Sequence, residues 1–555
     1  MTCAPGWTPV SDDEGVVVGC NPWPGGTRAT CTAVDEAHFP GEAGCARVGV
    51  ACPVGDFPEG LPADATVLYV QAGAPAGGDG SLATPFGTLT DALAAAPDGA
   101  TLAIAKGTYA EEVRLRRSVT LWGACAAETT LASPSTIYSV LSSGPTVELR
   151  NVHIRGGGGF LQGAGDLTLR GVVLSDTGSD GLALLDGTTI AEDVIVRRPE
   201  GSGVLVGRHA SATLRRVSIE EPTGYVVVST GGPVGASDLA AHGAGVSVGF
   251  ALGAQDDTAM ALERTVLEGP SAIIVTGTST LVMRDAWIDG GGGVTREFDG
   301  LQMYDTAKAR LERVRIVSAR ANALFVAESA DALLMDTTIA RVVDVSPGYG
   351  RAVDVEAGGR VSLVRVRIDE AGQVGVLAGD PGSHVQLEDV VVRRTRSDAS
   401  GLFGRAVQAQ VGATVDGVRV RLADNREVAL AAASPGTRVT ISDLDVSGTL
   451  ERECVTSTCP GLGGGIGVGA YLGGAVVLER ARVRHSVLVG IQLAREGAMD
   501  VSVGEVSDNP VGANVQIDGY DFMRISDRVG YLRNGTNLDS RALPIPDPTS
   551  PSAGP

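Results

Sequence analysis

Apolar and polar residues alternate in short runs along most of the chain, and each run ends at glycines. Between Gly350 and Glu427 the chain reads GRAVDVEAGGRVSLVRVRIDEAGQ, then VGVLAGDPGSHVQLEDVVVRRTRSDASGLF, then GRAVQAQVGATVDGVRVRLADNRE. Alternation predicts strands with one buried side, and self-similarity at a period of roughly 22–30 residues is typical of a solenoid. Similar runs recur from about Thr101 to about Arg533. We therefore expect one array of about 17 coils of short strands.

The composition fits a narrow core of stacked aliphatic side chains. The 555 residues are 43% hydrophobic but only 4% aromatic, and 77 of them are glycine. The formal net charge of −21 argues against a nucleic-acid partner or an anionic membrane. Lys106 and Lys308 are the only lysines. We interpret this bias toward arginine as a GC-rich genome rather than as an anion-binding design.

The eight cysteines predict disulfides and an oxidising compartment. Five of them, Cys3, Cys20, Cys31, Cys45 and Cys52, lie within the first 52 residues, without the paired spacing of zinc sites. Cys125 is the natural partner of the one left over, and the other N-terminal pairings stay open. Cys454 and Cys459 are close enough in sequence to close one small loop.

The chain divides into four segments. Residues 1–63 form a Cys-rich N-terminal cap that must be held by disulfides or docking, with Trp7 and Trp23 fixing it to its neighbour. Residues 64–124 are an opening segment, residues 125–540 the repeat array, and residues 541–555 a Pro-rich tail that we expect to be disordered.

The opening segment has a short helix from about Thr88 to Ala96. Thr88 and Asp91 have the spacing of a capping box, and Pro97 ends the helix. Two strands follow, on either side of the turn that begins at Lys106.

A family resemblance rests on four short motifs in this segment. They are Gly78-Asp79-Gly80-Ser81, Pro85-Phe86, Asp91-Ala92-Leu93, and Gly107-Thr108-Tyr109 with Glu112. This pattern resembles the DUF1565-like opening segment of secreted bacterial proteins with the pectin-lyase-like fold. The resemblance implies an all-β right-handed parallel β-helix whose first open coil is covered by the helix. That family includes lyases, hydrolases, epimerases and adhesins, so the fold alone implies no function.

Four long insertions share one place in the repeat, after a Val-Arg-Ile strand and before the Gly-x-x-Val strand. They are Asp289–Gly300, Asp344–Gly350, Arg396–Gly404 and Gly448–Ile466. We expect them to project from one corner over the outer side of the Gly-x-x-Val strands. Alternation then predicts that the inward residues of these strands are Met303, Phe325, Val353, Val355, Val407, Leu493 and Val515, and that the outward ones are Gln302, Tyr304, Asp354, Gln408, Gln492, Asn514 and Gln516.

This outward stripe is the candidate binding site. Amides donate and accept hydrogen bonds and aromatic rings offer apolar faces, so the stripe suits glycan hydroxyls and sugar rings. The predicted binding residues are Gln302, Tyr304, Asp354 and Gln408 in the strands, with Phe298, Tyr349, Arg396, Phe403 and Arg405 in or beside the loops. The alternative is that these residues are an ordinary solvated face.

No catalytic constellation is complete in the sequence. Polygalacturonase-like hydrolases need motifs of which only His242-Gly243 and Asp256-Asp257 occur, in the wrong order. A pectate-lyase-like Ca²⁺ site would need stacked carboxylates and an arginine base. Asp354 and Arg351 share a strand, but alternation turns Arg351 away from Asp354. We predict no catalytic residue, no metal site and no cofactor, with Ca²⁺ as the alternative.

Three hypotheses about function remain. The first is a non-enzymatic β-helix that is secreted or held at a bacterial cell surface and binds polysaccharide or another surface through the loop-bearing face. The second is a polysaccharide lyase that uses the same face, and the third is a structural spacer. No apolar run reaches membrane-spanning length. A lipid on Cys3 is an alternative anchor that no lipobox supports, and the sequence leaves the oligomeric state open.

Overall fold

The chain folds as an all-β parallel β-helix of about 18 turns with almost no helix, which confirms the predicted fold class. The computed structural model describes residues 2–63, 65–134, 138–243, 250–269, 272–290, 300–344, 349–453 and 463–547. Two compact units divide the chain. One consists of Thr2–Val10 with Cys20–Trp287, and the other of Ser11–Gly19 with Ile288–Pro555.

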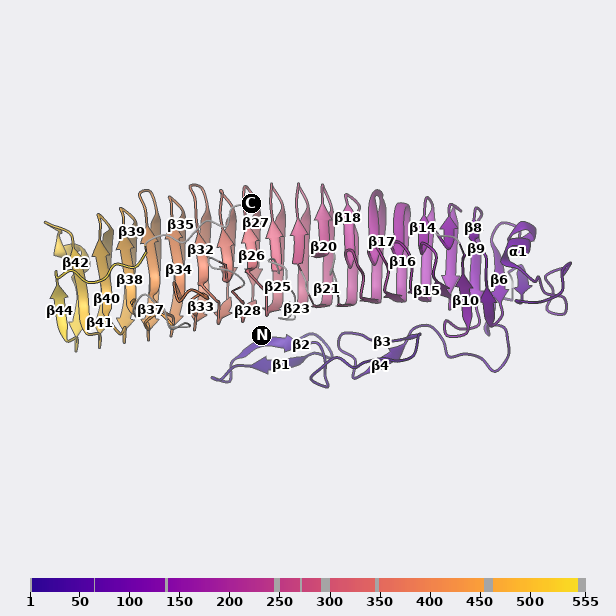
Figure 1. Ribbon diagram of the computed structural model, residues 1–555, viewed down its shortest axis with the longest axis horizontal. Helices are drawn as coiled ribbons and strands as arrows, with labels where there is room; N and C mark the ends of the chain where they lie inside the picture. Colours follow the sequence, from indigo (N-terminus) through magenta and orange to yellow (C-terminus); the bar gives the residue numbers. More distant parts are fainter. Residues whose placement is uncertain are drawn as a thin grey trace. The chain divides into compact units, whose positions relative to one another are not determined.

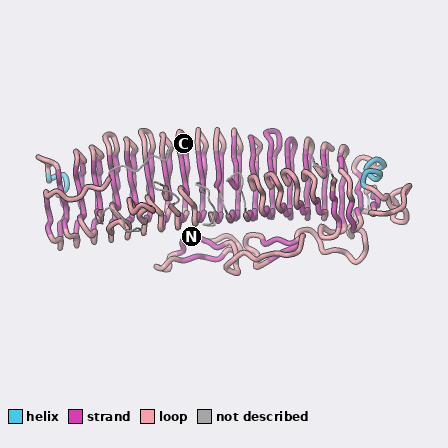
Figure 2. The backbone as a smooth tube through the Cα atoms, in the orientation of Figure 1, coloured by secondary structure: helices cyan, strands magenta, loops and turns pink. Residues whose placement is uncertain are grey.

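In the unit containing Cys20–Trp287, strands stack coil upon coil in parallel (Figures 1 and 2). A typical buried column is Leu169, Ala191, Leu214, Ala236 and Leu262, one residue from each of five coils. The strands of the coils that begin in this unit are β5 (Val67–Val70), β6 (Ala100–Ile104), β7 (Gly107–Tyr109), β8 (Val113–Leu115), β9 (Val119–Gly123), β10 (Thr129–Ala132), β11 (Val140–Ser142), β12 (Thr146–Arg150), β13 (His153–Arg155), β14 (Phe160–Gln162), β15 (Asp166–Ser175), β16 (Leu182–Arg197), β17 (Val204–Glu220), β18 (Val227–Thr230), β19 (Val234–His242), β20 (Phe250–Gln255), β21 (Ala259–Glu268), β22 (Ala272–Val275) and β23 (Thr280–Asp289).

The unit containing Ile288–Pro555 repeats this arrangement with a short strand and a longer, bent strand or strand pair in each coil. The short strands are β24 (Gly300–Met303), β26 (Asn322–Val326), β29 (Arg351–Val355), β32 (Val374–Ala378), β34 (Arg405–Gln410), β36 (Val428–Ala433), β38 (Ile466–Tyr471), β40 (Val489–Ala494), β42 (Val511–Gln516) and β44 (Thr536–Asp539). The others are β25 (Lys308–Val317), β27 (Asp331–Met335), β28 (Thr338–Ala340), β30 (Arg360–Val364), β31 (Arg367–Asp369), β33 (His384–Arg393), β35 (Thr414–Ala423), β37 (Arg438–Ser447), β39 (Ala475–Arg484), β41 (Ala498–Ser507) and β43 (Asp527–Leu532), with a 3-10 turn at Phe522–Ile525.

The helix α1 (Leu89–Ala95) forms where the sequence predicted one. Thr88 is its N-cap, because the Thr88 hydroxyl accepts a hydrogen bond from the Asp91 backbone N–H at 3.0 Å. Leu89 and Ala92 are its buried residues, and the helix contacts β5 and β8. Among the described residues no helix combines the length and the apolar character that crossing a membrane requires.

The Cys-rich segment of the first unit lies along the side of its coils. Its strands β3 (Glu36–His38) and β4 (Cys45–Arg47) pair antiparallel, and Phe39 packs on Val173 of β15 and Ile195 of β16. Trp7 and Trp23 are buried against β19 and β21, as expected for residues that fix this segment to its neighbour. Burial of these aromatic rings removes about 150–250 Å² of surface each, which makes them the main apolar anchors.

Three disulfides hold this segment: Cys3–Cys20, Cys31–Cys45 and Cys52–Cys125. The third confirms Cys125 as the partner of an N-terminal cysteine. The Cys3 sulfur is bonded to Cys20, so the alternative of a lipid on Cys3 is wrong for this disulfide-bonded form. The predicted Cys454–Cys459 pair lies outside the described residues.

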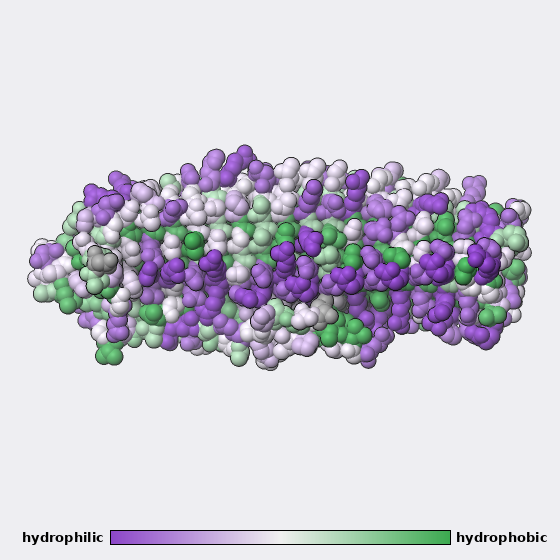
Figure 3. All heavy atoms as spheres, turned by 180° about the vertical axis from the view of Figure 1, so that it is seen from behind, coloured by the Kyte–Doolittle hydropathy of each residue, from purple (hydrophilic) through white to green (hydrophobic). Residues whose placement is uncertain are grey.

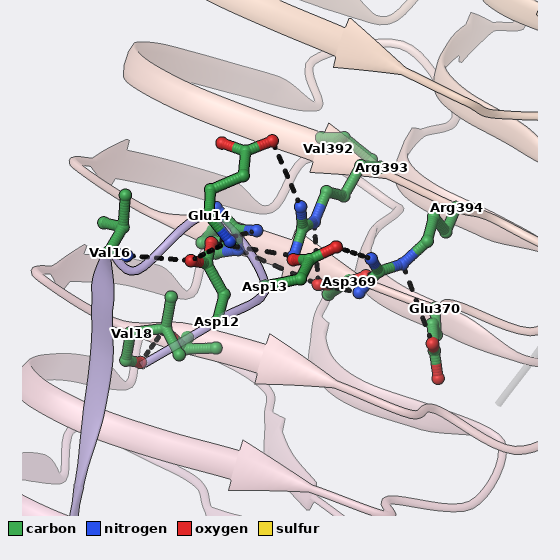
Figure 4. A network of polar contacts seen from close by, with 12 residues as sticks. Asp12, Asp13, Glu14, Val16, Val18, Asp369, Glu370, Val392, Arg393 and Arg394 are labelled. Carbon is green, nitrogen blue, oxygen red and sulfur yellow. Dashed lines mark hydrogen bonds and ion pairs between the residues drawn. The ribbon is translucent and has the colours of Figure 1, made fainter. Parts of the chain in front are cut away.

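In the second unit, residues 11–19 form an acidic turn against a cluster of arginines (Figure 4). Asp12 lies 2.7 Å from Arg367, and Asp13 lies 2.7 Å from Arg393. Backbone N–H groups and these two arginines hold the pKa of Asp12 below its usual value, against the effect of burial. The turn is therefore bound to the coils by charge-assisted contacts.

Candidate functional site

The loop-bearing face is built from the short strands of the second unit. Parallel pairing brings one outward position of every strand into a single column. In chain order the residues of this column are Gln302, Phe325, Asp354, Leu377, Gln408, Ala431, Gly469, Gln492, Asn514 and Asp539. The structure thus brings Gln302, Asp354 and Gln408 together on one side, as alternation predicts.

Phe325 is the exception, because it was predicted to point inward. Phe325 pairs with Gln302 and with Asp354, so it belongs to the outward column, and Leu324 lies in the inward one. The strand of Phe325 lacks the Gly-Arg-Ala-Val start that two other strands share, and a register error of one residue turns every side chain of a strand to the opposite face.

The predicted amide stripe is not open to solvent. Gln302 is 9% exposed, and Asp354, Gln408, Gln492 and Asn514 are completely buried. Alternation identifies the side of a strand but not what covers it. The described covering elements are the loop 396–404, which directly precedes β34, and residues 540–547, which contact Arg405 and Gln492 from far along the sequence.

At one end of the face, three aromatic rings cluster around β24 and β26. Tyr304 and Phe325 have ring centroids 5.7 Å apart, and the partly buried Tyr349 packs against the same cluster. The Tyr304 hydroxyl donates to Gln302 Oε1 at 3.3 Å. Burial and the nearby Glu328 carboxylate raise the pKa of Tyr304. Phe298, predicted to lie beside this group, is outside the described residues.

In the middle of the face, Arg351 and Asp354 form a buried ion pair. Arg351 Nη1 lies 2.8 Å from Asp354 Oδ2 and 3.2 Å from Glu356 Oε1, and Arg351 Nε donates to Gln373 at 3.1 Å. The prediction that alternation turns Arg351 away from Asp354 is therefore wrong. Both residues point outward, because the strand does not alternate strictly between them. Asn322 Nδ2 also donates to Asp354 at 3.2 Å.

The carboxylates around Arg351 are paired with the guanidinium. Desolvation raises the pKa of Asp354 to about 6, although Arg351 opposes that shift. Arg351 already neutralises the carboxylates around it, and both partners are inaccessible to a polymer. Elsewhere, the described residues bring together one metal-compatible group, Cys52, Cys125 and Glu128, whose two sulfurs are joined in a disulfide.

The next buried pair along the face is Arg405 with Glu427. Arg405 Nε donates to Glu427 at 2.6 Å, and Nη1 donates to Gln408 at 2.7 Å. The Phe403 ring lies 4.8 Å from the Arg405 guanidinium and is itself buried, so it covers the ion pair. Gly404, the residue before β34, has a φ of 111°, and a Cβ at this position would lie 2.5 Å from the Arg426 side chain. Both observations favour glycine here.

Arg396 points toward solvent, unlike the predicted binding residues Asp354 and Gln408, which are buried. Its side chain is exposed, and Nη2 lies 3.7 Å from the Glu370 carboxylate. Sequence reasoning missed Glu356, Glu427, Asn322 and Tyr471 as members of this face. The signal that could have found the acids is the Gly-Arg-Ala-Val start shared by two strands, because an arginine in a buried column requires a carboxylate partner.

Comparison with known proteins gives no family for this chain. No protein family matches the sequence, and no curated protein matches it. Several solved structures match the chain at low identity and low TM-score. The catalytic domain of Agl-KA is 14% identical with a TM-score of 0.23, over 87% of this chain and 69% of that chain. The PL6 family alginate lyase AlyGC is 10% identical with a TM-score of 0.21, over 85% and 99% of the two chains.

A third structure is the catalytic unit of a thermostable GH87 alpha-1,3-glucanase from Streptomyces thermodiastaticus, 13% identical with a TM-score of 0.17, over 90% of this chain and 72% of that chain. Identities and TM-scores this low carry no argument about activity. The DUF1565-like resemblance of the opening segment stays a prediction.

Proposed function

We propose that the protein is a secreted or cell-surface, non-catalytic β-helix that binds polysaccharide at the aromatic end of its loop-bearing face. This part of the face carries partly exposed rings beside an amide. The rings of Tyr304 and Tyr349 would pack on a sugar, and Gln302 would hydrogen-bond to its hydroxyls. The single observation that carries the proposal is this cluster of Tyr304, Phe325 and Tyr349.

The electrostatics favour a neutral polysaccharide over an anionic one. Glu328 is exposed beside Tyr304 and accepts a hydrogen bond from the Asp305 backbone N–H at 2.8 Å. The whole chain carries a formal net charge of −21. A polyuronate would meet like charge both at long range and at this site, so we expect its binding to strengthen with added salt.

A glycan array with neutral and acidic polysaccharides tests the proposal. The wild type is compared with the double variant Tyr304→Ala/Tyr349→Ala, and Tyr520→Ala, a partly buried tyrosine elsewhere in the same unit, is the matched control. We expect binding to a neutral glycan to fall at least about tenfold in the double variant and to be unchanged in the control. Blank arrays for the wild type, or equal binding by all three proteins, would overturn the proposal.

The lyase hypothesis is tested in the same samples. Absorbance at about 235 nm and new reducing ends would report β-elimination or hydrolysis of the polymers. We expect neither, because the Arg351 and Asp354 side chains are both buried and paired. Turnover abolished by Asp354→Asn would replace binding with catalysis as the function of this face.

A further inference from the structure

Residues 540–547 return along the outward side of the strands that precede them. The segment follows β44 and runs back over β42, β40 and the strands before them (Figure 1). At its far end the Asp547 carbonyl accepts a hydrogen bond from Arg405 of β34. This part of the Pro-rich tail therefore differs from the predicted disordered segment, whereas residues 548–555 lie outside the described residues.

The segment is fully extended. Arg541 contacts Asn514 of β42, and Asp547 contacts Arg405 of β34, four coils away. Leu543 also contacts β42, so only four residues separate contacts that lie four coil spacings, or ~19 Å, apart. Four fully extended residues span about 13–14 Å, and the long Arg405 side chain covers the remaining distance. The prolines at 544 and 546 favour this conformation, since each fixes its own φ and restricts the preceding residue to extended values.

The face offers side-chain hydrogen-bond donors to the backbone carbonyls of the segment. Proline has no N–H, so a proline-interrupted segment presents mainly carbonyls. Side-chain amides and one guanidinium meet these carbonyls in turn. Asn514 donates to Asp539 at 3.3 Å and to Arg541 at 2.9 Å, Gln516 to Leu543 at 3.1 Å, Gln492 to Pro544 at 3.1 Å, and Arg405 to Asp547.

The same stretch of the face is apolar where the segment places its aliphatic side chains. One outward column consists of Asn322, Arg351, Val374 and Arg405 in the earlier coils and becomes continuously apolar over β36–β42, with Val428, Ile466, Val489 and Val511. Leu543 and Ile545 pack against these valines and against Tyr471. Apolar residues two apart in an extended segment point to the same side, which explains why both reach this column.

We propose that this stretch of the face is a binding groove for an extended peptide of the form apolar-Pro-apolar-Pro, and that residues 540–547 are its exchangeable intramolecular occupant. The groove binds peptide carbonyls through Arg405, Gln492, Asn514 and Gln516. It accepts the two aliphatic side chains over β36–β42. This proposal does not depend on polysaccharide binding, which was assigned to the opposite end of the face.

The test uses the full chain and a fluorescently labelled peptide of residues 540–547. The variant Leu543→Asp/Ile545→Asp releases the chain's own segment, and Ala542→Asp, at an exposed position, is the matched control. We expect the peptide to bind the double variant saturably. Wild type and control should bind it at least about tenfold more weakly, because the tethered segment competes at an effective concentration in the millimolar range.

Two results would overturn the proposal: a folded double variant that binds no peptide, or a wild type that binds it as well as the double variant does. If the two aspartates unfold the chain, Leu543→Ala/Ile545→Ala is measured against the same criteria. Adding Gln516→Ala to the releasing variant should weaken peptide binding about fivefold, since one carbonyl loses its donor. Gln386→Ala, on another face, should not change it.

Discussion

Arg365 and Asp336 lie at equivalent corners of consecutive coils and form a two-pronged ion pair. Arg365 Nε donates to Asp336 Oδ1 at 2.7 Å, and Nη2 donates to Oδ2 at 2.8 Å. Both residues have left-handed backbone conformations, with φ values of 52° and 48°. The bend between the two halves of each coil's longer strand thus places one side chain directly above another.

The same alternation of aspartate and arginine recurs at this corner within each unit. Figure 3 shows hydrophilic side chains gathered in a band on one face of the molecule. The further pairs with arginine one coil beyond aspartate are Asp193–Arg216 and Asp238–Arg264 in the first unit, and Asp389–Arg419 and Asp443–Arg480 in the second. The planar guanidinium matches a carboxylate with two parallel hydrogen bonds, which a lysine does not provide. This geometry gives a structural role to part of the arginine bias that we attributed to the genome.

A double-mutant cycle on Asp336 and Arg365 should give a coupling free energy of about 0.5–1 kcal/mol, because both side chains are partly solvated. Arg365→Lys should lose most of it, since the ammonium group makes only one of the two contacts. Denaturant unfolding and hydrogen exchange of β27 and β30 measure the effect. Arg360→Lys, at the exposed start of β30, is the control and should be neutral. If Arg365→Lys and Arg360→Lys changed the stability equally, the two-pronged ion pair would have no stabilising role.

The repeat pattern predicted the fold because every coil repeats the same local rule. A period-two run, a glycine turn and a second run specify parallel stacking without any long-range information. The alternation of side-chain directions does not continue through the corners, however, because one residue with a left-handed backbone, such as Arg365, changes the side to which the following residues point. Side-chain directions predicted across a corner or a register change, as for Phe325, are therefore unreliable.

The candidate site was predictable in position but not in accessibility. Gln302, Asp354 and Gln408 share a column because parallel register follows from the repeats. The loop 396–404 was expected to project over these strands, but the contacts of residues 540–547 with Arg405 and Gln492 join positions far apart in sequence, which no local pattern encodes. The proline-rich composition predicted a disordered tail and gave no indication of the strands that residues 540–547 contact.

Removing one partner of the buried Arg405–Glu427 pair should be strongly destabilising. Glu427→Gln leaves a guanidinium that is 1% exposed without its carboxylate, and such losses are typically about 3–5 kcal/mol. Arg405→Met/Glu427→Met removes both charges and should cost much less. Unfolding of the second unit, followed by hydrogen exchange of β34 and β36, measures the difference. A double variant as unstable as Glu427→Gln would contradict the explanation by an unpaired charge.

The stability of the coil containing Asp354 should fall as the pH rises from about 4 to about 6. Desolvation raises the pKa of this carboxyl to about 6 in the folded chain, against 3.8 for the free group. In that window the folded state holds a proton that the unfolded state has lost, so raising the pH favours unfolding, by on the order of 2–3 kcal/mol. Hydrogen exchange of β29 at several pH values measures how steeply the local stability changes with pH. Asp354→Asn should remove it, whereas Asp331→Asn, at an exposed position of the same unit, should not.

The unit containing Cys20–Trp287 should become more stable as the pH rises, because His153 is buried in it. The imidazole is 7% exposed with Nε2 2.8 Å from Ser175 Oγ, and desolvation lowers its pKa to about 4, against 6.5 for the free group. Between about pH 4 and 6.5 the unfolded chain takes up a proton that the folded chain does not. Acid therefore destabilises this unit, by about 2 kcal/mol between pH 7 and pH 4.5.

Tryptophan fluorescence can follow this unit alone, because all four tryptophans of the chain lie in it. His153→Gln keeps a hydrogen-bonding group beside Ser175 but does not titrate, so it should remove the pH dependence attributed to the histidine. His209→Gln, at an exposed position of the same unit, should leave that dependence intact. A slope of unchanged size in His153→Gln would show that other groups carry the acid sensitivity, and that the buried imidazole contributes nothing to it.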